Sequence, residues 1–261
     1  MLNDAEKRRY SRQTHLFGTV GQEKLKRTSV FVAGAGGLGS VISFYMAAAG
    51  FGKIRIVDCD SVELSNLNRQ ILHSNADVGR PKTRSAYETL TGINPEIEVE
   101  ALEETIREDN IRELLRGSDL IMDAMDNFPI RYLLNREALK RKIPIFHGAI
   151  RGYQGQATTI IPGRTACLFC LFPRAPPPST FPALGSTCGV IGSIQVTEAV
   201  KYVTGTGELL ENRLLLWDGL HATVDEVAYE RNASCRECSG APRTDRRQSE
   251  DNSNASIDCE K

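Results

Sequence analysis

A glycine-rich segment near the amino end of the chain has the spacing of a phosphate-binding loop. It follows the apolar residues 29–33, precedes a helix-length stretch at 40–49, and contains Gly34, Gly36, Gly37 and Gly39. The first glycine permits a tight turn, the second lets the backbone approach phosphate, and the third lets helix and strand pack closely. Asp58 ends the next apolar stretch, where an acceptor for a ribose hydroxyl belongs. These residues predict a nucleotide-binding half-fold and leave NAD and ATP as alternatives.

Polar residues beyond Asp58 favour a triphosphate ligand. The candidate contacts are Asp60, Asn66, Arg69, Gln70 and Lys82. Cations beyond a ribose acceptor suit a triphosphate better than a single pyrophosphate bridge, because Arg and Lys make charge-assisted hydrogen bonds to phosphate oxygens. The alternative is a solvated polar loop.

Asp126 and Asn127 follow another apolar stretch, residues 119–124. If that stretch is a strand of a parallel sheet, both residues lie at the edge where ligands of such sheets bind. The carboxylate of Asp126 is a hard oxygen ligand of the kind that Mg²⁺ prefers. A surface turn is the alternative interpretation.

Four of the seven cysteines form two C-x-x-C pairs, which are Cys167, Cys170, Cys235 and Cys238. In a reducing compartment such pairs indicate metal binding rather than disulfide formation. Four thiolates saturate a tetrahedral zinc and leave no open position, which favours a structural site over a catalytic one. A redox-active pair or free thiols are the alternatives.

The elements that position these residues alternate between strand and helix over the first part of the chain. Strands are predicted at 29–33, 53–58, 96–101, 119–124 and 143–149, with helices at 40–49, 81–90, 110–116 and 131–142. This alternation predicts a Rossmann-like α/β fold with a largely parallel sheet and helices on both faces. His147 ends the last of these strands, and we interpret it as a structural histidine rather than a pocket residue.

The pattern changes after the fifth strand. Further strands are expected at 156–161, 213–217 and 224–231, a proline-rich extended loop at 172–185, and a helix at 190–204. We therefore divide the chain into a helical arm (1–28), a nucleotide-binding half (29–150), a smaller zinc-bearing part (151–239) and a disordered tail (240–261). The tail prediction depends on its lack of aromatic residues and its single large aliphatic residue.

Composition excludes several classes of protein. The 261 residues carry a net charge of −1, which argues against a chain built to hold nucleic acid or an anionic membrane. No apolar run approaches the roughly 18 residues of a membrane-spanning helix. No signal peptide is visible at the amino end, so the expected location is the cytoplasm.

The ordered motifs together resemble the MoeB/ThiF/HesA family, the ubiquitin-activating-enzyme-like adenylyltransferases. The matching segments lie within roughly residues 5–240 and are 9–13 (RYSRQ), 34–39 (GAGGLG), 58–60 (DCD), 65–70 (SNLNRQ), 79–82 (GRPK), 123–127 (DAMDN), 189–195 (GVIGSIQ) and both cysteine pairs. The resemblance implies a homodimer that binds Mg-ATP and the Gly-Gly tail of a small ubiquitin-like sulfur-carrier protein. It further implies that the enzyme joins the tail carboxylate to AMP and releases pyrophosphate.

The resemblance also implies residue roles. Gly36, Gly37 and Gly39 would contact phosphate and Asp58 the ribose; Asn66, Arg69 and Lys82 would neutralise the triphosphate; Asp126 would hold Mg²⁺; and Arg12 would enter the ATP site of the neighbouring subunit. The smaller zinc-bearing part would receive the carrier. Charge stabilisation of this kind assists attack of a carboxylate on the α-phosphate, and no protein nucleophile is needed.

One feature departs from the family pattern. Many relatives carry a reactive cysteine at a place that falls near Pro178, whereas this chain has Cys188 directly before Gly189. Cys188 is interpreted as a small residue at a helix start, with a reactive thiolate as the alternative. We expect a separate sulfurtransferase to deliver sulfur. The motifs do not distinguish molybdopterin, thiamine or tRNA-thiolation carriers.

Two other function classes remain open at this point. An NAD-dependent oxidoreductase on the same half-fold explains the glycines and Asp58, but not Arg12, Asn66, Arg69, Lys82 and Asp126 together. A non-catalytic zinc-held scaffold for ubiquitin-like proteins predicts substitutions among the triphosphate contacts, and the sequence shows none.

Overall fold

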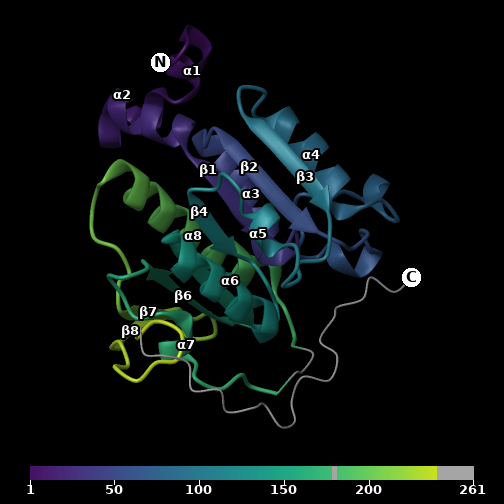
Figure 1. Ribbon diagram of the computed structural model, residues 1–261. Coiled ribbons are helices and arrows are strands. Elements are labelled where there is room, and N and C mark those ends of the chain that lie inside the picture. Colours follow the sequence, from purple (N-terminus) through teal and green to yellow (C-terminus); the bar gives the residue numbers. More distant parts are fainter. Residues whose placement is uncertain (178–180, 240–261) are drawn as a thin grey trace.

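The computed structural model describes residues 1–177 and 181–239, and these form one mixed eight-stranded sheet covered by helices (Figure 1). The strand order is β3-β2-β1-β4-β5-β6-β7-β8. The strands are β1 (Ser29–Ala33), β2 (Lys53–Asp58), β3 (Glu98–Glu103), β4 (Leu120–Asp123), β5 (Ile145–Arg151), β6 (Gln154–Ile160), β7 (Arg213–Asp218) and β8 (Thr223–Ala228). The helices are α1 (Asp4–Arg9), α2 (Ser11–Arg27), α3 (Gly37–Ala49), α4 (Lys82–Ile93), α5 (Ile111–Leu114), α6 (Phe128–Arg141), α7 (Leu168–Leu171) and α8 (Gly185–Thr204), with 3-10 turns η1 (Leu64–Asn66) and η2 (Asn75–Asp77).

Strands β1 to β5 run parallel to one another, and β6, β7 and β8 continue the sheet, each antiparallel to the strand before it. The predicted α/β fold with a largely parallel sheet is therefore confirmed. The boundary drawn after residue 150 falls inside β5, which pairs with β6 along its whole length. The sheet is thus continuous across the nucleotide-binding half and the smaller part. The predicted disordered tail, 240–261, lies outside the described residues.

Most element ends differ from the sequence expectation by up to three residues, and the start of α8 differs most. Helix α8 begins at Gly185 rather than near Val190, while β8 ends at Ala228 rather than Arg231. Residues Gly185–Gly189 are poor helix formers by intrinsic propensity, so the earlier start depends on tertiary contacts. Thr187 supplies one of them, because its Oγ1 donates to the carbonyl of Gly152 at 2.9 Å.

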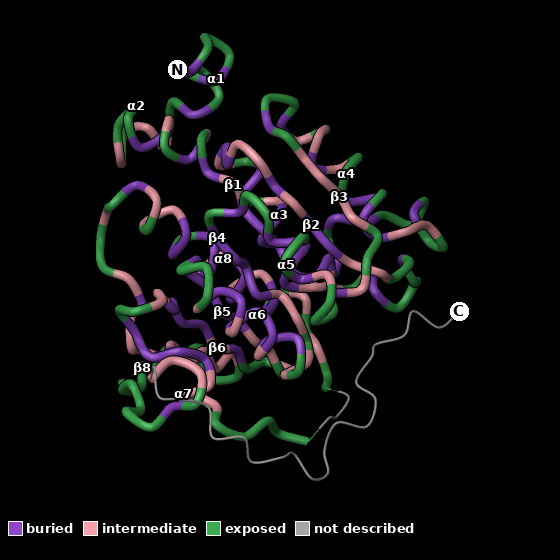
Figure 2. The backbone as a smooth tube through the Cα atoms, viewed as in Figure 1, coloured by how far each residue is buried: buried purple, intermediate pink, exposed green. Residues whose placement is uncertain are grey.

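Side chains alternate between two hydrophobic cores, one on each face of the sheet. Buried residues gather in the middle of the molecule, around β1 and β4 (Figure 2). Val30 and Val32 of β1 pack toward α3, α4 and α8, and Phe31 and Ala33 pack toward α5 and α6. This alternation follows from the two-residue period of a strand. Because helices cover both faces of the sheet at β1 and β4, the sequences of these strands are nearly continuous apolar runs.

The edge strands of the described sheet are β3 and β8. All six residues of β8 are exposed, whereas β1 at the centre is almost wholly buried. Within the described part of the chain, no helix combines the length and the apolar character needed to cross a membrane.

The chain changes direction across the sheet between β1 and β4. Strands β2 and β3 lie on one side of β1, while β4 and β5 lie on the other. Ligands of open α/β sheets bind in the crevice at the carboxyl ends of the strands, at such a switch point. The segments that follow β1, β2 and β4 therefore meet at the edge of the sheet where a ligand is expected.

Candidate nucleotide site and cysteine cluster

The glycine loop joins β1 to α3 at the carboxyl edge of the sheet. Gly36 is the N-cap of α3, and its carbonyl accepts from the N–H of Ser40 at 2.8 Å. A Cβ built on Gly39 would lie 1.9 Å from the carbonyl oxygen of Gly34. Any side chain at Gly39 would therefore push the helix off the strand, which is the close packing that the motif predicts. The first turn of α3 leaves backbone N–H groups without intrahelical partners, as an anion site requires.

Ala35, inside the glycine loop, is held from two sides. Its N–H donates to Oδ2 of Asp58 at 2.7 Å, and its carbonyl oxygen lies 3.3 Å from Nε2 of His73. The other oxygen of Asp58 accepts from the N–H of Asp60 at 2.8 Å. Asp58 thus fixes the loop, and burial raises the pKa of its carboxyl group, while nearby Lys82 opposes that effect.

His73 is a residue that sequence reasoning missed. Its Nδ1 lies 2.9 Å from Oγ of Ser85 on α4, so the imidazole bridges α4 and the glycine loop. Burial lowers its pKa, which keeps the ring neutral at pH 7. Its partners lie 12 and 38 residues away in the sequence, so only the fold brings them to the imidazole.

Lys82 is the first residue of α4 and is buried. Its Nζ lies 2.6 Å from Oδ2 of Asp60 and 4.0 Å from Oδ1 of Asp58. The sequence-predicted cation therefore stands beside the predicted ribose acceptor. An ammonium has three N–H donors, so Lys82 keeps donor capacity for a phosphate group beside its contact with Asp60.

Asn66 and Arg69 lie on the segment between β2 and α4 and make local contacts. The Oδ1 of buried Asn66 accepts from the N–H of Glu63 at 3.1 Å, which caps η1. The Nη1 of Arg69 donates to the carbonyl of Ser65 and to Oδ1 of Asn68, both at 3.0 Å.

Gln70 is buried beside the glycine loop. Its Nε2 lies 3.9 Å from the Cβ position of Gly36. Among the described residues, its Oε1 has no hydrogen-bond partner. Leaving a buried acceptor unsatisfied costs about 1–3 kcal/mol, so this amide is a good candidate to bind a ligand at the loop.

Asp126 lies on the segment between β4 and α6. It is exposed, and its Oδ1 accepts from Nδ2 of Asn127 at 3.3 Å. The Oδ1 of Asn127 caps α6 by accepting from the N–H of Ile130 at 3.1 Å. The N–H of Ala124 donates to the carbonyl of Ala33 at 3.2 Å, so this segment starts beside the glycine loop.

His147 is fully buried behind this segment, as its interpretation as a structural histidine predicts. Its Nδ1 lies 2.7 Å from Oδ2 of Asp123, which is equally buried. Burial lowers the pKa of His147, so the neutral ring donates from Nδ1. Arg131 and His147 hold the pKa of Asp123 below its ordinary value despite burial.

Arg12 lies away from this site. Its neighbour Gln13 donates to the carbonyl of Ala49, at the C-terminal end of α3, at 2.8 Å. Tyr10 accepts from Nδ2 of Asn94, which ends α4, at 2.8 Å. Both helix ends lie near the amino ends of the parallel strands, whereas the glycine loop lies at their carboxyl ends. The exposed Arg12 is therefore not brought together with the other predicted site residues in this chain.

Cys188 is buried in the first turn of α8, in agreement with its interpretation as a small packed residue. Its Sγ lies 2.7 Å from the Cβ position of Gly37, so the thiol fills the space that Gly37 leaves open. Burial raises the pKa of the thiol, with Arg69 opposing that effect. The protonated form is therefore favoured, and the position near Pro178 where relatives carry a cysteine lies outside the described residues.

The four cysteines of the two C-x-x-C pairs come together beyond the sheet. Their Sγ atoms all lie within 4.8 Å of one another, with separations of 3.9 Å for Cys167–Cys170, 3.7 Å for Cys167–Cys235 and 3.5 Å for Cys170–Cys238. A tetrahedral zinc with Zn–S bonds of about 2.3 Å needs S···S separations near 3.8 Å. The cluster therefore fits a closed zinc site, and none of the four forms a disulfide.

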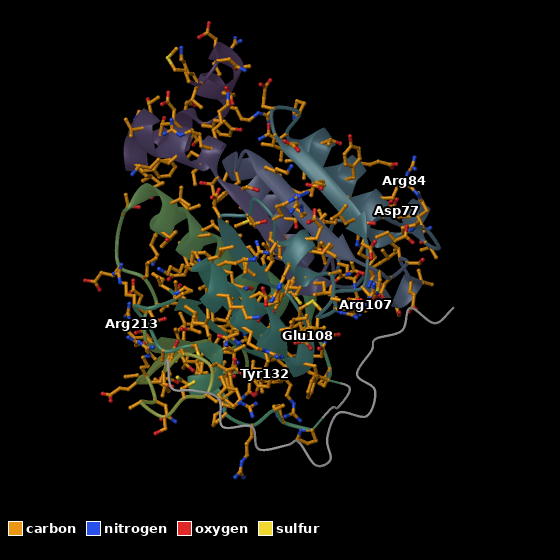
Figure 3. The ribbon with its side chains drawn as sticks, in the orientation of Figure 1. Asp77, Arg84, Arg107, Glu108, Tyr132 and Arg213 are labelled. Carbon is orange, nitrogen blue, oxygen red and sulfur yellow. The ribbon has the colours of Figure 1, made fainter. Side chains whose placement is uncertain are left out.

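Helix α6 links this cluster to the nucleotide site. The N–H of Leu168 in α7 donates to Oδ1 of Asn135 at 3.0 Å. The hydroxyl of Tyr132, labelled in Figure 3, donates to the carbonyl of Phe172 at 2.7 Å. The knuckle and the start of the proline-rich loop are therefore fixed to the helix whose first turn follows Asp126.

We expect one zinc ion per purified chain and a loss of stability when the cluster is broken. Cys170→Ser removes one thiolate from a closed site that contributes folding energy, so both the zinc content and the unfolding temperature should fall. Elemental analysis and thermal unfolding measure the two effects. Cys59→Ser, outside the cluster, is the control and should keep its zinc. A wild-type content under about half an equivalent would contradict a structural zinc.

Comparisons with known proteins agree with this geometry. The model of the ThiF family matches residues 10–237. The SAMP-activating enzyme E1 of Haloferax volcanii is 44% identical over 238 residues, covering 88% of each chain. The sulfur carrier protein adenylyltransferase of Thermus thermophilus is 41% identical over 247 residues, covering 90% of this chain and 91% of the relative.

A longer relative and a solved structure are also similar to this chain. The adenylyltransferase and sulfurtransferase MOCS3 of Aedes aegypti is 41% identical over 92% of this chain, which covers 57% of that longer protein. A crystal structure of E. coli MccB with ATP shares the fold, with a TM-score of 0.80 and 23% identity over 88% of this chain and 74% of that one. The extent of the family match and the identity to relatives of similar length lead to one conclusion: this chain belongs to the ThiF family.

Proposed function

We propose that this chain is an adenylyltransferase that activates the C-terminal glycine of a small ubiquitin-like sulfur-carrier protein. One observation carries the choice of ATP: a buried cation, Lys82, stands beside the ribose-acceptor candidate Asp58, near the unsatisfied amide oxygen of Gln70 at the glycine loop. Lys82 can donate to a phosphate oxygen, and the amide oxygen can accept from a hydroxyl or amino group of the nucleotide. Membership of the ThiF family and the names of its two most fully covered relatives support the same activity over an NAD-dependent oxidoreductase or a non-catalytic scaffold.

The proposed reaction is an attack of the carrier's terminal carboxylate oxygen on the α-phosphorus of ATP. A bond forms between that oxygen and phosphorus, the bond to the β-phosphate bridge breaks, and pyrophosphate leaves. We assign phosphate contacts to Gly36, Gly37 and Gly39 and the ribose contact to Asp58. The triphosphate and the remaining nucleotide contacts are assigned to Asp60, Asn66, Arg69, Gln70, Lys82 and Asn127. Positioned positive charge stabilises the charge that develops in such a step.

Asp126 is suited to bind magnesium, because its exposed carboxylate lies beside the glycine loop. Proteins commonly hold Mg²⁺ with one or two carboxylates together with the phosphates of the substrate. When bound, Mg²⁺ would neutralise charge on the phosphates. The cysteine cluster would hold zinc in a structural role. It carries no open position, so it takes no part in the reaction.

Two partners complete the proposal. The smaller part, from β6 to the cysteine cluster, offers exposed apolar residues at Leu220, Val224 and Val227 for the carrier. A second copy of the chain would supply Arg12 to the site, since Arg12 lies at the opposite sheet edge of its own subunit. A separate sulfurtransferase would then deliver sulfur to the adenylated carrier, a division that fits the longer MOCS3 relative, whose name includes both activities.

The test is ATP–pyrophosphate exchange. Pull-down with the purified chain should identify a small Gly-Gly-ended protein, and adding that protein should start exchange of labelled pyrophosphate into ATP. In the absence of a carrier, ATP should raise the unfolding temperature and NAD should not, because only a ligand of the native state stabilises it. Protection by NAD without protection by ATP would refute the proposal.

Cys188→Ser should adenylate the carrier at close to the wild-type rate. The reaction needs no thiol, and burial keeps this one protonated. Because serine buries a hydroxyl group, Cys188→Ala serves as a second variant that separates packing from chemistry. Intact-protein mass spectrometry after incubation with ATP and carrier checks for covalent complexes. A dithiothreitol-sensitive adduct of enzyme and carrier that is absent from both variants would make Cys188 a nucleophile instead.

A further inference from the structure

Three buried polar side chains, Asp123, Arg131 and His147, form a cluster behind the segment that carries Asp126. The exposed fractions of the Asp123, Arg131 and His147 side chains are 1%, 6% and 0%. Such burial of an ion pair is costly, because the loss of hydration often exceeds the attraction between the charges. Retaining the pair therefore calls for a reason other than stability.

The contacts of the pair converge on one peptide unit, that of Met125. Asp123 Oδ1 accepts from the N–H of Met125 at 3.1 Å. Arg131 Nη2 donates to the carbonyl of Met125 at 2.6 Å and to the carbonyl of Gly148 at 3.2 Å. Both backbone groups of the residue before Asp126 are thus held by charged side chains.

The pair is itself held in place. Arg131 Nε lies 3.5 Å from Asp123 Oδ2, the same oxygen that receives the His147 hydrogen bond at 2.7 Å. Gln195 on α8 donates to the carbonyl of Asp123 at 2.9 Å and to that of Phe146 at 2.8 Å. Strands β4 and β5 and helices α6 and α8 therefore fix the pair from several directions.

We propose that the buried pair Asp123–Arg131 positions the Asp126 carboxylate for its metal by clamping the Met125 peptide. This inference rests on the proposed function, in which Asp126 holds the Mg²⁺ of Mg-ATP. Residues that hold a metal ligand in place commonly contribute about 10- to 100-fold in metal affinity. Asp123 and Arg131 are positioning residues here, because neither reaches the ligand.

The decisive variant is Arg131→Lys, which keeps the charge beside Asp123 but loses the planar fork that reaches two carbonyls. We expect the Mg²⁺ concentration for half-maximal ATP–pyrophosphate exchange to rise about 10-fold or more. Hydrogen exchange over residues 124–128 should become faster while exchange in β1 and β2 stays unchanged. Arg136→Lys is the matched control on the same helix, where the arginine pairs with exposed Glu108, and it should change neither quantity.

A second variant covers failure of the first to fold. Asp123→Asn with Arg131→Gln replaces the ion pair by two neutral amides, which leaves no uncompensated buried charge, and the same two effects are expected. Unchanged hydrogen exchange over residues 124–128 in a folded variant would overturn the proposal. Faster hydrogen exchange there, without a change in the Mg²⁺ concentration needed for half-maximal activity, would also overturn it. If the wild-type chain shows no exchange of pyrophosphate, the proposed function fails, and hydrogen exchange alone then decides whether the pair clamps the loop.

Discussion

Replacing Asp126 with alanine is expected to lower the rate of ATP–pyrophosphate exchange by about 100- to 1,000-fold, the range for losing one group that stabilises developing charge. The side chain is exposed and its hydrogen bond is to neighbouring Asn127, so its loss removes little packing. The unfolding temperature should therefore stay close to that of the wild type. Exchange assays at saturating carrier, with circular dichroism to confirm folding, make the measurement.

Asp109→Ala provides the matched control for this experiment. Asp109 is also exposed, and its partner is the surface residue Arg107 at 3.4 Å. Surface ion pairs contribute little, so this variant should exchange within a factor of about two of the wild type. A comparably small loss in Asp126→Ala would remove Asp126 from the catalytic site.

Arg12→Ala should also be inactive, and its activity should return in part when it is mixed with Asp126→Ala. The contacts of Gln13 and Tyr10 hold the Arg12 segment at the sheet edge opposite the glycine loop, so Arg12 would act only across a dimer interface. In a two-fold symmetric heterodimer of the two variants, one site would combine an intact Arg12 with an intact Asp126. Differently tagged subunits allow the heterodimer to be purified and assayed.

The two variants control each other, because neither homodimer should exchange pyrophosphate. Mass spectrometry of the purified mixture verifies that subunits have exchanged. If a verified heterodimer stays inactive, Arg12 either acts within its own subunit or has no role in the site. Sedimentation of the wild type as a monomer at assay concentration would exclude the mechanism altogether.

Residues with local signals were predictable from the sequence. Gly39 could be assigned to close packing because its motif fixes its place at the start of a helix, and the carbonyl oxygen of Gly34 lies 1.9 Å from its Cβ position. The cysteine pairs were predictable for a related reason, since a two-residue spacing brings thiols together in any knuckle. The two pairs lie far apart in the sequence, and predicting that they come together required only the assumption that they share one metal ion.

Residues whose role depends on distant partners were not predictable. Arg131 is the first residue of a predicted helix, and nothing local shows that it reaches Met125 and Gly148. His73 lacked an identifiable partner because Ala35 and Ser85 are brought to it only by the fold. The start of α8 was misplaced because packing of Cys188 against Gly37 outweighs the weak helix propensity of Gly185–Gly189.

The two edge strands of the sheet bear on self-association. Edge strands present unpaired backbone groups that can pair with another copy of the chain. Both edges here carry carboxylates: β3 has Glu98, Glu100 and Glu103, and β8 has Asp225 and Glu226. Pairing of like edges would bring these charges together, which disfavours fibrous growth of the sheet at neutral pH. That protection is electrostatic, so it is expected to weaken as added salt screens the charges, and high ionic strength should favour edge-to-edge aggregation of folded chains.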